Sequence, residues 1–178
     1  DSCNVFYYTV GYNLSFKESS TYNDATGIKY LQKYASIFGF DRKTGLEIAE
    51  SQSQIADEYP VMAAIGQSNN NMTTASLSRY VTAVASGKVY EYKLMSKIVD
   101  CNGNIVVNYE PVYNDISTTL HADEWQAIHK GMNLVTSTNF LFQSLGFEVA
   151  GKTGTAQQVA TRPNHALFVG FAPYENPE

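Results

Sequence analysis

The chain has 178 residues, of which 44% are hydrophobic, 13% aromatic and 16% charged, and its formal net charge is −5. This composition is too apolar for a disordered chain, and a net negative charge without a basic run argues against a nucleic-acid-binding surface. No apolar stretch approaches the ~20 residues that a membrane-spanning helix needs. A chain of this length can form one large domain, and a compact fold would remove roughly 70% of its unfolded surface from water.

Cysteine and histidine usage predicts neither a disulfide framework nor a metal site. Cys3 and Cys101 lie far apart, and one pair is too few to staple a small domain. His121, His129 and His165 lack the spacing of metal ligands with each other or with the cysteines. We therefore predict no metal and no cofactor.

Apolar residues recur at helical spacing three times in the first half of the chain. Residues 5–14 are predicted as a helix that Ser2 or Asn4 could cap, since either side chain can accept from the free amides of a first turn. Thr73 or Thr74 can cap a later helix in the same way. Two of the stripes end at a glycine, which suits a helix terminus: Ile28, Leu31, Tyr34, Ala35 and Phe38 precede Gly39, and Leu77, Tyr80, Val81, Val84 and Ala85 precede Gly87.

The segments between these helices, and the hairpin that follows them, are predicted from turn residues. Residues 15–26 and 39–58 are polar and without periodicity, which predicts surface loops. Asn102-Gly103 lies between the apolar runs 93–99 and 105–108, and this arrangement predicts a hairpin remote from the chemistry.

The last third of the chain predicts one more helix and a strand pair. Apolar residues from Trp125 to Val135 mark the helix, with Asp123 and Glu124 in its first turn, where acidic side chains suit the helix dipole. Residues 147–159 and 165–172 are predicted as strands that pair antiparallel. We expect residues 1–178 to form one structural unit with an α+β fold, an antiparallel sheet flanked by helices.

Lys-Thr-Gly occurs twice, in different settings. Lys43-Thr44-Gly45 lies in a polar loop and is predicted to be a solvated turn. Lys152-Thr153-Gly154 lies within the first predicted strand and is followed by a second hydroxyl, that of Thr155. A cation and two hydroxyls on a strand whose glycines let a ligand approach the backbone are typical of an anion site.

The pairing of Ser2-x-Asn4 early with Lys152-Thr153-Gly154-Thr155 late resembles two of the three motifs of the penicillin-binding and serine β-lactamase superfamily. Residues 149–157 and 165–173 are also similar to penicillin-binding transpeptidase sequence. The long interval between Asn4 and Lys152 resembles class B penicillin-binding proteins more than the compact class A β-lactamases. The resemblance spans nearly the whole chain.

The third motif, Ser-x-x-Lys, holds the nucleophile of that superfamily and lies upstream of Ser-x-Asn. No serine of the chain is followed three residues later by lysine; Ser76 comes nearest, with Arg79. We therefore expect residues 1–178 to be the C-terminal part of a transpeptidase domain that lacks the upstream nucleophile segment and a final strand. The fragment itself is expected to be inactive.

The resemblance implies a role for each matched residue. Ser2 and Lys152 would be catalytic, with Ser2 relaying a proton to the leaving nitrogen. Asn4, Thr153, Gly154 and Thr155 would bind substrate, the D-alanyl-D-alanine end of a peptidoglycan stem peptide or a β-lactam. The purely structural alternatives are a helix cap at Ser2 or Asn4, an ordinary strand lysine at Lys152, and a β-bulge at the glycines.

The same resemblance implies a peptidoglycan D,D-transpeptidase at the extracytoplasmic face of a bacterial membrane. Its parent would be anchored by a helix outside this chain and would work with other cell-wall synthesis proteins. Two alternatives stay open. A D,D-carboxypeptidase or β-lactamase would use the same residues and pass the acyl group to water, and a non-catalytic β-lactam sensor would use the fold only to bind.

Overall fold

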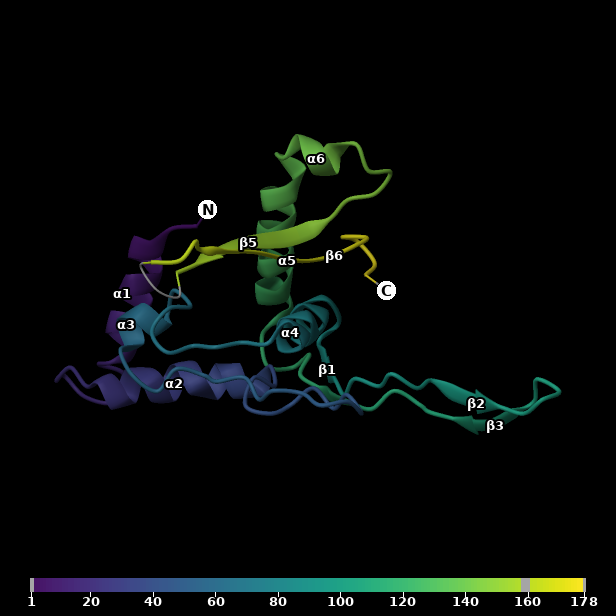
Figure 1. Cartoon of the computed structure of the whole chain (residues 1–178). Coiled ribbons are helices and arrows are strands. Elements are labelled where there is room, and N and C mark those ends of the chain that lie inside the picture. Colours follow the sequence, from purple (N-terminus) through teal and green to yellow (C-terminus); the bar gives the residue numbers. More distant parts are fainter. Residues whose placement is uncertain (1, 158–160, 178) are drawn as a thin grey trace.

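The structure is a computed structural model that describes residues 2–157 and 161–177. Figure 1 shows three groups of elements: a helical layer at the N-terminal side, a strand pair crossed by a helix, and a hairpin that projects away from both. The helices are α1 (Asn4–Leu14), α2 (Asp24–Ile37), α3 (Pro60–Ala63), α4 (Thr74–Ser86), α5 (Ala122–Ser137) and α6 (Phe140–Gln143). The strands are β1 (Lys88–Tyr90), β2 (Lys97–Val99), β3 (Ile105–Asn108), β4 (Tyr113–Asp115), β5 (Ala150–Ala156) and β6 (His165–Phe171).

The helical layer forms because α3 fits against bare backbone on α1 and α2. A Cβ at Gly11 of α1 would lie 2.6 Å from the carbonyl oxygen of Pro60, and one at Gly27 of α2 would lie 2.7 Å from the Cβ of Pro60. Only glycine allows so close an approach at these two positions. Asn23 caps α2, accepting from the amide of Ala25 at 2.9 Å, so the predicted loop 15–26 ends three residues early.

Helix α4 confirms its prediction at both ends. The Thr73 side chain caps it by accepting from the amide of Ser76, and Gly87 ends it with a φ of 69°. Between them Val81, Ala83 and Val84 are buried. Ala83 packs in a small core with Val89 and Ile116, and Phe38 and Trp125 pack against that core.

The sheet structure consists of three separate antiparallel pairs, β1–β4, β2–β3 and β5–β6. The α+β architecture, with antiparallel strands and flanking helices, is as predicted. The short strands β1 and β4 were not predicted, because three residues carry too little alternation to detect. The predicted strand 147–159 is shorter in the structure, where β5 runs from Ala150 to Ala156, and Val159 lies outside the described residues.

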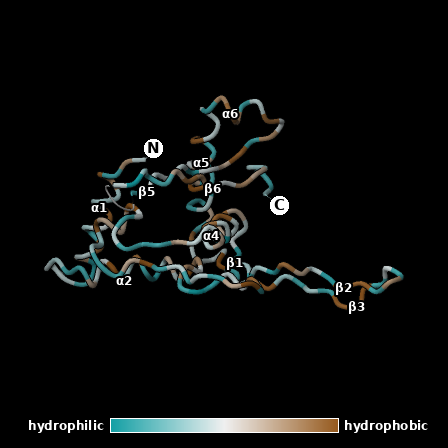
Figure 2. The backbone as a smooth tube through the Cα atoms, in the orientation of Figure 1, coloured by the Kyte–Doolittle hydropathy of each residue, from teal (hydrophilic) through white to brown (hydrophobic). Residues whose placement is uncertain are grey.

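The β2–β3 hairpin forms at the predicted Asn102-Gly103 turn and makes few contacts beyond itself. Figure 2 shows a hydrophobic stretch along it, and Ile105 and Val106 are 60% and 63% exposed. Among the described residues, no helix combines the length and apolar character needed to cross a membrane.

Candidate functional site

The register of β5 with β6 places the Lys-Thr-Gly-Thr segment. Lys152 pairs with Val169 and Thr153 pairs with Phe168. Since successive residues of a strand point to opposite faces, the side chain of Lys152 projects from one face and those of Thr153 and Thr155 from the other. Within the described chain β5 pairs only with β6, so its second edge presents unpaired backbone groups.

The start of α1 brings Ser2 to this strand. The Lys152 Nζ donates to the Ser2 Oγ at 2.7 Å, and it also donates to the carbonyl oxygen of Thr153 at 2.7 Å. In Figure 1 the N-terminal end lies close to one end of β5. The packing of α1 on α3, which depends on Gly11, therefore determines where Ser2 lies.

The charge of Lys152 is free to meet an anion. In the described part of the chain the two ion pairs are Lys29–Glu18 and Arg42–Asp41, and no carboxylate pairs with Lys152. The amine is bound instead by neutral oxygens. Thr153 and Thr155 are both exposed, so a cation and two hydroxyls are accessible along four residues of one strand.

The other predicted residues lie close to this pair in the chain. Asn4 is the first residue of α1 and is exposed, and Gly154 lies on β5 between the two threonines. The helix-cap alternative for Ser2 and Asn4 is wrong, because the cap position is Cys3 and no side chain caps α1. The Ser2 hydroxyl is bound by a lysine 150 residues away instead.

The loop copy of Lys-Thr-Gly is only partly solvated, contrary to prediction, because Lys43 and Gly45 are exposed but the residue between them is not. Thr44 is fully buried, and its Oγ1 donates to a Glu50 carboxylate oxygen at 2.6 Å. Arg79, also buried, donates to the carbonyl oxygens of Lys43, Arg42 and Gly39. Burial lowers the pKa of the Arg79 guanidinium. This copy therefore has a structural role, folding the loop 39–50 onto α4.

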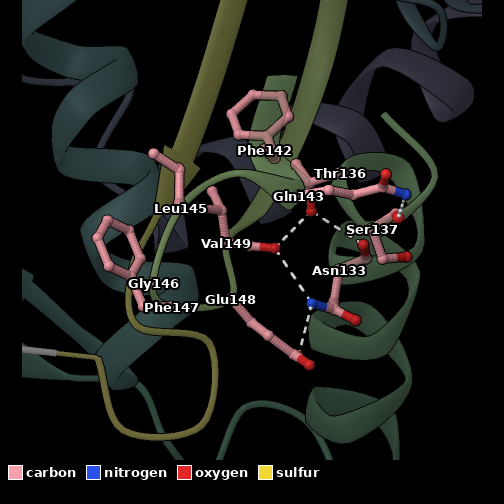
Figure 3. Close-up of a pocket in the computed structure, with 10 residues that line it drawn as sticks. All are labelled: Asn133, Thr136, Ser137, Phe142, Gln143, Leu145, Gly146, Phe147, Glu148 and Val149. Carbon is pink, nitrogen blue, oxygen red and sulfur yellow. Dashed lines mark hydrogen bonds between the residues drawn. The ribbon is translucent and has the colours of Figure 1, made fainter. Parts of the chain in front are cut away.

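Two polar residues of α5 bind the backbone of the residue that precedes β5, and neither was predicted as a site residue. The Asn133 Nδ2 donates to the carbonyl oxygen of Val149 at 3.2 Å, and the Thr136 Oγ1 donates to the same oxygen (Figure 3). Thr136 is 1% exposed. A buried threonine hydroxyl is expected to have a hydrogen-bond partner. The sequence does not reveal that this threonine is buried, because that requires knowing which face of the helix is packed.

A cavity of about 380 Å³ lies beside these contacts, between α5, α6 and the chain leading into β5. Figure 3 shows Phe142, Leu145 and Phe147 around it, together with Asn133 and Glu148. None of the six predicted site residues lines it. The cavity adjoins the Lys-Thr-Gly strand but is separate from the Ser2–Lys152 contact.

The family model of the penicillin binding protein transpeptidase domain matches residues 1–178. The chain belongs to this family. Within it, the peptidoglycan D,D-transpeptidase MrdA of Haemophilus influenzae is 29% identical over 215 residues, covering 100% of the chain and 31% of MrdA. Penicillin-binding protein H of Bacillus subtilis is 24% identical and covers 99% of the chain and 28% of its own length. The chain thus spans about a third of these curated penicillin-binding relatives.

Solved penicillin-binding proteins share the fold. PBPA from Mycobacterium tuberculosis superimposes with a TM-score of 0.78 at 20% identity, covering 98% of the chain and 41% of PBPA. Its imipenem acyl-enzyme complex gives 0.77 at 22% identity, covering 99% and 39%. PBP2 in complex with MreC from Helicobacter pylori gives 0.71 at 22% identity, covering 98% and 32%.

Proposed function

We propose that the chain forms the carboxylate-binding wall of a peptidoglycan D,D-transpeptidase that cross-links stem peptides and binds β-lactams. The observation that carries the proposal is the hydrogen bond between Lys152 and Ser2, which joins the two family motifs across 150 residues. The relatives named as peptidoglycan D,D-transpeptidases support the reaction class. Because no Ser-x-x-Lys occurs in the 178 residues, the proposal assigns the nucleophile to a part of the protein outside them.

The exposed residues of β5 would bind the substrate's terminal carboxylate. The hydroxyls of Thr153 and Thr155, on one face of β5, would donate to the anionic carboxylate in charge-assisted hydrogen bonds. Lys152, on the other face, would add the attraction of its positive charge. Gly154 leaves room for the substrate backbone beside the strand. The backbone amide of Thr155 would be one half of the oxyanion hole that stabilises the tetrahedral intermediate.

Ser2 and Lys152 would together protonate the leaving group. When the acyl group moves to the nucleophile, the nitrogen of the departing D-alanine must gain a proton. Ser2 can donate its hydroxyl proton to that nitrogen while the Lys152 ammonium returns one to the Ser2 Oγ, which it already contacts at 2.7 Å. Asn4, two residues after Ser2, would bind the amide of the substrate.

The proposed setting is the extracytoplasmic face of a bacterial membrane, where peptidoglycan is built. The H. pylori PBP2 of similar fold was solved in complex with MreC. By analogy we propose that the parent of this chain is anchored by a helix outside it and works with other cell-wall synthesis proteins. Whether its acyl group reaches an amine or water would separate a transpeptidase from a carboxypeptidase or β-lactamase.

The two Lys-Thr-Gly copies provide a matched test. In the full-length protein, Lys152→Ala should lower the rate of acylation by fluorescent penicillin by about 10²-fold or more, the usual effect of removing a charged donor from such a site. Lys43→Ala, the same change at the exposed lysine of the loop copy, should leave acylation near the wild-type rate. Equal rates for wild type and Lys152→Ala would show that β5 is not the binding wall.

A further inference from the structure

The glycine immediately before Lys152 pairs with a second glycine on the neighbouring strand, and one aromatic ring covers both. Gly151 on β5 pairs with Gly170 on β6. A Cβ at Gly151 would lie 2.6 Å from the Cε2 of Phe168, and one at Gly170 would lie 2.8 Å from its Cε1. Both distances are shorter than real Cβ contacts allow, so the Phe168 ring rests directly on the backbone of both strands.

A second ring holds Phe168 in this position. Phe142 of α6 stacks on it with ring centroids 5.4 Å apart and an interplanar angle of 24°. Phe142 lines the same cavity as Asn133, Thr136 and Val149, so the ring is tied to the α5 contacts at the entrance to β5 (Figure 3). A continuous set of contacts therefore runs from α5 and α6 through Phe168 to Gly151.

Without this ring, the paired glycines would be the least constrained position of the β5–β6 strand pair. Glycine has the widest backbone freedom of any residue, and in a strand it offers no side chain to pack. An aromatic side chain laid across a strand glycine restores that packing and pins the register. Lys152 follows Gly151 directly, so movement at the glycine pair would move the amine that contacts Ser2.

We propose that Phe168 is a positioning residue of the acyl-transfer site, and that its ring braces Gly151 so that Lys152 points at Ser2. Phe142 is the second part of this brace. The inference rests on the proposed function for the role of Lys152, while the brace itself rests on the contacts of the two rings. Misplacing a catalytic group by about 1 Å can cost about 10²-fold in rate.

The brace can be tested in the full-length protein, independently of acylation, by competitive acetylation of lysines followed by mass spectrometry. Phe168→Ala should raise the labelling of Lys152 several-fold relative to the exposed hairpin residue Lys97, because the amine is freed from Ser2. Phe142→Ala should give a smaller rise. Phe140→Ala, the same change in the same helix at a 75% exposed ring, is the control. An unchanged ratio, or an equal rise at every lysine, would overturn the proposal.

A double-mutant cycle asks whether the ring acts through the glycine. Gly151→Ala places a methyl where the ring lies and should also raise Lys152 labelling. The Phe168→Ala background removes the two ring atoms nearest to that methyl and leaves the carbonyl oxygen of Val169 at 3.2 Å as the next one, so the second change should add much less than it does alone. Strict additivity would contradict the brace.

The rate of penicillin acylation in the full-length protein then separates this inference from the proposed function. Phe168→Ala should slow penicillin acylation about 10- to 100-fold while the affinity of the initial complex changes little. If Lys152→Ala slows acylation and Phe168→Ala does not, positioning by Phe168 is wrong and the proposed function stands. If neither variant slows it, the function is wrong, and the labelling ratio still decides whether the brace exists. Phe142→Ala takes the place of Phe168→Ala if the latter fails to fold.

Discussion

Ser2 shows how a residue's partner can differ from the one its neighbours suggest. Its position before a helix favours capping, yet its hydroxyl accepts from Lys152 on a strand 150 residues away. Breaking this contact should change the free energy of unfolding little, because Ser2 is exposed. Under the proposed function its significance lies in chemistry, since a hydroxyl beside an ammonium group can pass a proton without a histidine.

Ser2→Ala in the full-length protein should therefore separate chemistry from stability. Removing the proton relay should reduce penicillin acylation about 10²-fold or more, within the usual range for general acid–base groups. The free energy of unfolding should change by less than about 0.5 kcal/mol, as expected of an exposed side chain. Ser51→Ala, at an exposed serine of the irregular loop, is the matched control for both measurements. A wild-type acylation rate in Ser2→Ala would remove Ser2 from the mechanism.

At the scale of elements, the loop 39–50 behaves as a folded unit with no regular structure. Thr44 and Arg79 are buried in it, and Glu50 accepts from both the amide and the hydroxyl of Thr44. Burial by itself raises the pKa of Glu50, but the hydrogen bonds from Thr44 and Gly45 outweigh it and hold the pKa below its ordinary value.

This depressed pKa predicts a pH dependence with a definite sign. A carboxylate whose folded pKa lies below its unfolded value, about 4.3 for Glu, contributes stability that is fully present above that value. The contribution is lost as the pH falls through the folded pKa. Urea unfolding should show Glu50→Gln less stable than wild type at pH 7, with the gap narrowing below about pH 4. Glu58→Gln, at an exposed carboxylate, should show no such convergence. A gap that is constant with pH would mean that Glu50 acts only through its shape.

The β2–β3 hairpin is the opposite case, a regular element with little packing. Val106→Lys, at a 63% exposed position, should change the free energy of unfolding by less than about 0.5 kcal/mol. It should also reduce self-association measured by light scattering, since a lysine on an exposed strand discourages edge pairing. Val89→Lys, at a 3% exposed position on β1, should be strongly destabilising by comparison. A large loss of stability in Val106→Lys would show that the hairpin is packed against something.

Elements with local signals were predictable, and those that depend on remote partners were not. Helix α4 was foreseen because its cap, apolar stripe and terminal glycine all lie within the helix or beside it. The burial of Thr44 was missed because Arg79 and Glu50 supply it from elsewhere in the chain. The Ser2–Lys152 pair came from the resemblance of two motifs, since no periodicity links residues so far apart. The Phe168 brace has no one-dimensional signal, because it requires the register of β5 with β6.

At the scale of the whole molecule, the chain exposes more surface than its mass requires. Its accessible surface is 11,821 Å², whereas a compact monomer of this mass would expose about 8,600 Å². Burial on folding is therefore nearer 60% than the roughly 70% expected of a compact fold. Large apolar side chains account for part of the excess, among them Val5 and Phe6 on α1 and Phe140 on α6, which are 72%, 60% and 75% exposed.

Exposed apolar surface on this scale marks an interaction site or an aggregation risk. We therefore expect the isolated 178-residue chain to bind 8-anilinonaphthalene-1-sulfonate strongly and to associate in solution. We also expect it to resist labelling by fluorescent penicillin, because no serine in it is followed three residues later by lysine. Within the full-length protein these residues should bind much less of the dye, and the protein should become labelled at the nucleophile proposed to lie outside them. Stable acylation of the isolated chain would disprove the need for a nucleophile from outside it, and a dye signal that persists undiminished in the full-length protein would show that these apolar faces serve a different partner.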